Sequence, residues 1–130
     1  MLATALWRES IARSPYGGSW FDWRQLLEAE KASYDTHAAS PDTTRAMGPG
    51  VVLFDDFGAE RDTPNSRDFA NRIFSHRHSQ GLPTIVTSNA ADLAALDGPV
   101  DTRVVSRYAD GSKVIVLAGR DRRIFGVEAA

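Results

Sequence analysis

The sequence has no cysteine, little lysine and no long apolar run, and each absence excludes a class of protein. Without cysteine, the chain has neither a disulfide framework nor a cysteine-ligated metal site. No apolar run approaches the roughly 20 residues that a membrane helix needs, which excludes a membrane protein. The first residues lack the basic start and unbroken apolar stretch of a signal peptide. These absences fit a cytoplasmic location.

The charge balance gives no sign of a nucleic-acid-binding surface. The formal net charge is −2, so no overall basic field would attract a polyanion. Among the 15 basic residues only Lys31 and Lys113 are lysines, and the others are arginines. A length of 130 residues, with 42% hydrophobic and 25% charged residues, is typical of one small globular domain.

Apolar spacing and chain breakers divide the sequence into alternating helices and strands. Helices are expected over residues 1–12, 24–34, 66–80, 92–96 and 102–108. Strands are expected over residues 19–23, 51–54, 84–87 and 113–118, and residues 36–50 predict a loop with one helical turn. Alternating strands and helices predict an α/β domain of three layers, with a mostly parallel sheet at its centre.

Two acids follow the most apolar of the expected strands. Asp55 and Asp56 end the run at 51–54, which places two carboxylates at the carboxyl edge of a parallel strand. Ligands bind at that edge in open α/β sheets. A nucleotide-bound Mg²⁺ would compensate the carboxylates, with Asp55 holding the ion through water and Asp56 orienting an attacking water. The alternative is that the two acids simply end the strand and begin a turn.

The next expected strand ends in three hydrogen-bonding side chains, Thr87, Ser88 and Asn89. An amide at that position can place a water or a phosphate oxygen beside the neighbouring acids. Ser88 and Asn89 can equally serve as the N-cap of a helix that begins near Ala90. These two interpretations are compatible with each other.

A pair of arginines lies on one face of the helix expected at 102–108. Arg103 and Arg107 are spaced i,i+4 and repel each other unless an anion or a partner surface compensates them. One interpretation is an arginine finger presented to a nucleotide on a neighbouring subunit. The other is a pair of solvated surface arginines.

The order of these segments resembles the AAA+ ATPases of the helicase-loader group, in particular DnaC/DnaI-type loaders and IstB-type transposition helpers. The resemblance rests on Asp-Asp-Phe-Gly-Ala-Glu-Arg at 55–61, Gly-Leu-Pro-Thr-Ile-Val-Thr-Ser-Asn at 81–89 and Arg-Val-Val-Ser-Arg at 103–107. It covers nearly the whole chain and implies a P-loop NTPase fold with ATP and Mg²⁺ as cofactors.

The resemblance also implies roles for individual residues. Asp55 matches the Walker B aspartate that holds magnesium, and Asp56 takes the place of the catalytic acid. Asn89 matches the polar sensor-1 residue near the phosphates, and Arg107 matches the arginine finger. Arg123, in the basic segment 119–123, is similar to a final basic residue near the phosphates, although this segment could equally be a solvated basic end.

The sequence departs from the family pattern at its front. In this family a glycine-rich phosphate loop ending in Gly-Lys-Thr or Gly-Lys-Ser runs into a helix resembling the one that opens this chain. No G-x-x-x-x-G-K-[ST] occurs in the 130 residues. The resemblance therefore implies that residues 1–130 are a partial AAA+ core, incomplete at the N-terminus and inactive by itself. The missing strand would leave strands 84–87 and 113–118 with unpaired edges.

The sequence does not distinguish a helicase loader from a transposition helper. Both use the same ATPase core, so the implied partner is a replicative helicase or a transposase. The intact family member is expected to form a homo-oligomer. A third interpretation is a degenerate, non-catalytic adaptor, such as a phage product, that keeps the loader surface but has lost nucleotide binding.

Two further interpretations rest on local patterns. Trp20, Phe21 and Trp23 could stack the bases of single-stranded DNA, but three aromatics on a strand are more often core residues. His76 and His78 could ligate a metal, but a spacing of i,i+2 points two rings on a helix apart.

Overall fold

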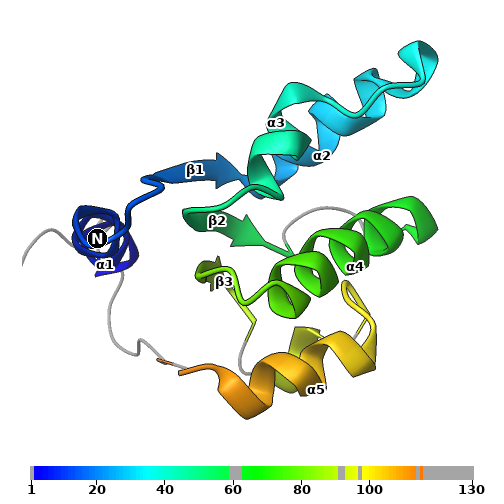
Figure 1. Cartoon of the computed structure of the whole chain (residues 1–130). Coiled ribbons are helices and arrows are strands. Elements are labelled where there is room, and N and C mark those ends of the chain that lie inside the picture. Colours follow the sequence, from blue (N-terminus) through cyan, green and yellow to red (C-terminus); the bar gives the residue numbers. More distant parts are fainter. Residues whose placement is uncertain (1, 59–62, 91–92, 97, 114, 116–130) are drawn as a thin grey trace, which may run out of the picture.

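A computed structural model of the chain describes residues 2–58, 63–90, 93–96, 98–113 and 115. It contains a parallel sheet in the order β1-β2-β3, which confirms the expected α/β class (Figure 1). The strands are β1 (Gly18–Asp22), β2 (Val51–Phe57) and β3 (Thr84–Ser88). The helices are α1 (Leu2–Ala12), α2 (Trp23–Ala32), α3 (Pro41–Ala46), α4 (Pro64–Ser79) and α5 (Thr102–Gly111), with short 3-10 helices η1 (Tyr34–Thr36) and η2 (Leu93–Leu96).

Polar caps determine where most of the helices begin. The Asp22 side chain accepts a hydrogen bond from the Gln25 backbone N–H, so the residue that ends β1 also starts α2. Thr63 and Ser66 form a reciprocal capping box, and Pro64 occupies the first turn of α4. Because this cap precedes the apolar face of α4, the helix starts two residues earlier than its apolar spacing predicts.

The two faces of the sheet are covered by different helices. Val52 and Phe54 belong to the main apolar core, so the intervening Leu53, which is also buried, faces the other side. On that side α1 contacts β2 and β3, and the Trp7 indole N–H donates to the Val51 carbonyl at 3.0 Å. Gly18 permits the close approach of α1, since a Cβ there would lie 2.6 Å from Ile11 Cγ1.

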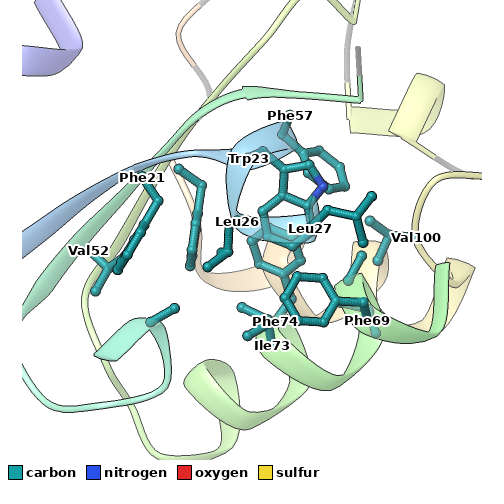
Figure 2. Close-up of a cluster of buried hydrophobic side chains, with 14 residues drawn as sticks. Phe21, Trp23, Leu26, Leu27, Val52, Phe57, Phe69, Ile73, Phe74 and Val100 are labelled. Carbon is teal, nitrogen blue, oxygen red and sulfur yellow. The ribbon is translucent and has the colours of Figure 1, made fainter. Parts of the chain in front are cut away.

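Aromatic rings fill the core between the sheet and the helices α2 and α4 (Figure 2). Trp23 is fully buried, and its ring centroid lies 4.9 Å from that of Phe57 and 5.4 Å from that of Phe74. Phe21 is also buried, whereas Trp20 is 45% exposed. Two of the three aromatics considered for base stacking are therefore core residues, because the core occupies their ring faces.

The structure describes only two residues of the strand expected at 113–118. Lys113 and Ile115 have no regular secondary structure, and the rest of the strand expected at 113–118 lies outside the described residues. Within the described sheet, β3 is hydrogen-bonded to β2 and forms one edge. No helix in the described ranges is both long enough and apolar enough to cross a membrane.

Candidate functional site

The carboxyl ends of β2 and β3 lie together because these two strands are parallel neighbours. Phe54 pairs with Val86, so the residues that follow them meet at one sheet edge. The Thr87 hydroxyl donates a hydrogen bond of 2.6 Å to Asp55 Oδ1, and it accepts one of 2.9 Å from the Asp56 backbone N–H. The two acids identified in the sequence thus share one threonine at the edge where α/β proteins bind ligands.

The two acids lie in a β-bulge of β2 against β3. Phe54 pairs with Val86 and Phe57 pairs with Ser88, so three steps along β2 match two along β3. The extra residue is accommodated at Asp56, whose φ of 59° lies in the left-handed region. Aspartate and asparagine adopt this region more readily than other side chains do.

The bulge explains why β2 continues beyond the point where the sequence predicts its end. In a regular strand Phe57 would face away from Phe54, because side chains alternate. With one extra residue both rings enter the same aromatic core, and Phe57 is only 2% exposed. Burial of that ring outweighs the modest strain at Asp56, and the Asp56 side chain is left exposed to solvent. The expectation that residues 55–58 stop the strand was wrong.

The polar end of β3 borders a small cavity. The Ser88 hydroxyl donates to the Phe57 carbonyl at 2.8 Å and accepts from the Ala90 N–H at 3.1 Å, so it ties the two strand ends together. Asn89 is exposed and lines a cavity of about 240 Å³ together with Phe57, Ser88 and Leu96. The amide thus has access to solvent at the end of β3. The helix expected at 92–96 is the 3-10 helix η2.

The arginines are not brought to the acids within this chain. Arg103 and Arg107 are both exposed on α5, which packs against α4 and η2. In the described part of the chain Arg107 makes no hydrogen bond or ion pair with Asp55 or Asp56. Arg103 lies 3.5 Å from Asp101, the cap of the same helix. Arg123 lies outside the described residues.

The two histidines considered as metal ligands contact different neighbours. His76 Nε2 lies 2.9 Å from the Met47 carbonyl oxygen, and the His78 ring packs against Tyr108 at 5.3 Å between centroids. Among the described residues, no group of three or more histidine, cysteine, aspartate or glutamate side chains could hold a metal ion.

A buried carboxylate on α2 has no counterpart in the expected site. Glu30 is 5% exposed and accepts hydrogen bonds from the Thr43 hydroxyl at 2.6 Å and from Arg72 at 2.8 Å. Burial tends to raise the pKa of Glu30, but these hydrogen bonds and the charge of Arg72 outweigh it and leave the pKa below its ordinary value. The carboxylate thus joins α2, α3 and α4, and its position on the apolar face with Leu26 and Leu27 was the signal for it in the sequence.

The lowered pKa of Glu30 predicts a pH-dependent contribution to stability. Since the folded pKa lies below the ordinary value of 4.5, the contribution is complete above about pH 5 and is lost as the pH falls through the folded pKa. We expect Glu30→Gln to lower the free energy of unfolding by about 1–2 kcal/mol at pH 7, with the difference from the parent protein shrinking in acid. Urea unfolding followed by circular dichroism from pH 7 to pH 3 measures this.

The matched control is Glu28→Gln on the same helix, where the carboxylate is exposed and lies 3.7 Å from Arg24. This variant should change stability by less than about 0.5 kcal/mol at every pH. A difference between Glu30→Gln and the parent protein that stays constant down to pH 3 would contradict the assignment.

A second buried charge clamps the start of the sheet. Arg77, on α4, is fully buried, and burial lowers its pKa against a small opposing effect of Tyr108. Its guanidinium donates to Thr84 Oγ1 and to four backbone carbonyls, at 2.9–3.0 Å. The carbonyls belong to Ala46, Gly48, Gly50 and Pro83. One side chain therefore joins the loop before β2 to the start of β3.

Comparison with known proteins gives one informative likeness. No family model matches the sequence, and no curated protein matches it. A solved structure described as the crystal structure of the DnaC helicase loader is similar to the chain, with a TM-score of 0.63 and 20% sequence identity. The likeness covers 75% of this chain and 59% of that structure, so this chain spans less than two thirds of its length. The chain therefore has, in part, the α/β fold of the structure described as the DnaC helicase loader.

Proposed function

We propose that the chain is part of the ATPase core of a DnaC-like loader of the replicative helicase. The observation that carries the proposal is the edge shared by β2 and β3, where Asp55 and Asp56 meet Thr87 and where Asn89 follows at the end of β3. The likeness in fold to the DnaC helicase loader supports it. ATP is the proposed ligand, and the helicase is the proposed partner.

The residues at this edge suit the separate tasks of nucleotide hydrolysis. The Asp55 carboxylate, half-buried and held by Thr87, would bind the cation of a magnesium nucleotide. That cation would supply positive charge to offset the charge of the phosphates. The exposed Asp56 carboxylate would orient a water molecule, and the Asn89 amide would hold a water or a phosphate oxygen.

The exposed position of Arg107 fits a role between subunits. A guanidinium that acts on a nucleotide in the neighbouring subunit has to point away from the acids of its own chain. Arg107 is exposed to solvent on α5, and no carboxylate of the described residues forms an ion pair with it. The proposal therefore includes a homo-oligomer in which Arg107 of one copy completes the site of the next.

The chain as written is expected to hydrolyse no ATP above background. No glycine-rich loop with its lysine occurs in the 130 residues, so the acids have no phosphate held beside them. Phosphate release from purified protein, with Mg²⁺ and ATP, measures this. The same chain extended at its N-terminus by a parallel strand and a G-x-x-x-x-G-K-T loop should show magnesium-dependent turnover.

The extended chain also separates the alternatives. Absence of both nucleotide binding and turnover in the extended chain would indicate the non-catalytic adaptor and would contradict the proposed ATPase. Co-purification of the extended chain with a replicative helicase, but not with a transposase, is expected for a loader, and the opposite result would indicate a transposition helper. A gel shift of single-stranded DNA by the chain alone would instead favour a DNA-binding module.

A further inference from the structure

One hydroxyl group contacts both acids of the proposed site. The hydrogen bonds of Thr87 have defined directions, because the backbone N–H of Asp56 can only donate and the Asp55 carboxylate can only accept. The Thr87 oxygen therefore accepts from Asp56 at 2.9 Å and sends its own proton to Asp55 Oδ1 at 2.6 Å. A hydroxyl has one proton to donate, so the bond to Asp55 uses all of its donor capacity.

These two bonds act on different parts of the site. The bond to Oδ1 fixes how the Asp55 carboxylate is rotated, which sets the direction of its remaining lone pairs. The bond from the Asp56 N–H holds the backbone of the bulge, where φ is 59° and the side chain turns into solvent. The strand opposite the acids thus determines both the orientation of one carboxylate and the exposure of the other.

We infer that Thr87 is a positioning residue that orients the Asp55 carboxylate to bind a divalent cation. This rests on the proposed function, since the cation is the one that a nucleotide would bring. Hydrogen-bond partners of this kind, one shell outside a metal ion, typically change metal affinity by tenfold or more when they are removed. Valine has almost the same shape as threonine but no hydroxyl, so Thr87→Val removes both bonds with little change in volume.

The test uses Mn²⁺ alone as a probe of the cation site in the ¹⁵N-labelled chain. Paramagnetic broadening of the amide signals of residues 55–57 and 87, followed during titration, gives an apparent Kd. We expect Thr87→Val to raise this Kd about tenfold and Thr87→Ser, which keeps the hydroxyl, to change it by less than about twofold. Thr87→Ala is a second hydroxyl-free variant should valine disturb the strand.

A second measurement, the proton signal of the Thr87 hydroxyl, needs no metal ion. A hydroxyl proton held by a carboxylate exchanges slowly with water, so the Thr87 hydroxyl should give a detectable proton signal in the parent protein. In Asp55→Asn an amide replaces the carboxylate, so this hydroxyl signal should be weaker or absent in that variant. A merely structural role of Thr87 in the bulge would leave the Mn²⁺ Kd unchanged.

The controls distinguish failure of this inference from failure of the proposed function. Asp55→Asn should abolish the broadening, and wild-type broadening in that variant would overturn the cation site and the role of Thr87 with it. If Asp55→Asn abolishes the broadening whereas Thr87→Val and Thr87→Ala keep the parent Kd, the positioning role is wrong and the proposed function stands.

Discussion

Replacing Arg77 with methionine is expected to destabilise the chain by about 3–4 kcal/mol. Methionine keeps the apolar length of the side chain but removes every donor, so the carbonyls of Ala46, Gly48 and Gly50 lose the hydrogen bonds from Arg77. The Pro83 carbonyl and the Thr84 hydroxyl also lose a bond, although each keeps one other partner, the Val52 N–H and the Leu82 carbonyl. Buried polar groups without a partner keep the full cost of leaving water. Since small domains are stable by only about 5–15 kcal/mol, a loss of this size is a large share of the total.

Urea unfolding followed by circular dichroism measures the effect, with two variants beside it. Arg13→Met removes an exposed arginine directly after α1 that pairs with Glu9, and it should change stability by less than about 0.5 kcal/mol. Arg77→Lys keeps a charge but offers three donors instead of five, so an intermediate loss is expected. Equal stability of Arg77→Met and Arg13→Met would show that the clamp between the loop and β3 contributes nothing.

Replacing Asp56 with asparagine is expected to lower ATP turnover of the N-terminally extended chain at least about 100-fold. The reason is that the amide cannot accept a proton from the attacking water as a carboxylate can. Asparagine is the right substitution here because Asp56 lies at φ 59°, a conformation that asparagine adopts as readily as aspartate does. The bulge, and with it the burial of Phe57, is therefore expected to remain.

The measurement is steady-state phosphate release, and two observations make it specific. Nucleotide affinity should change by less than about threefold, because the effect concerns the reacting water rather than binding. Asp56→Ala should lose turnover equally and also lose about 1 kcal/mol of stability, because alanine is strained in the left-handed region. Turnover of Asp56→Asn at the parent rate would remove Asp56 from the proposed mechanism.

Most elements could be predicted from local patterns in the sequence. The apolar run before Asp55, the breakers that end the helices and the regular spacing in α4 each depend on neighbouring residues, and these elements formed close to their expected places. The departures have long-range causes. β2 continues to Phe57 because a ring from β2 fills a core built by α2 and α4, and a local pattern cannot show that the core has space for it.

The candidate site is likewise divided between features that local patterns predict and features that depend on long-range contacts. Asp55, Asp56 and Asn89 were identified because each comes after an apolar run that predicts a strand, and parallel pairing then puts the carboxyl ends of β2 and β3 at one edge. The role of Thr87 was missed, since it depends on the register of β2 against β3 and on the bulge between them. Trp23 packs against Phe69 and Phe74 of α4, which comes much later in the chain, so only the structure could decide between a core role and base stacking.

The sequence by itself determined the class of fold, the order of the elements and the polar residues at the ends of the strands, because these follow from spacing, caps and apolar runs. Only the tertiary structure decided that Thr87 holds both acids, that Asp56 lies in a bulge and that Arg77 clamps the start of the sheet. The physical reason is that each of these contacts joins residues more than five positions apart, and their geometry exists only once the strands and helices have packed together.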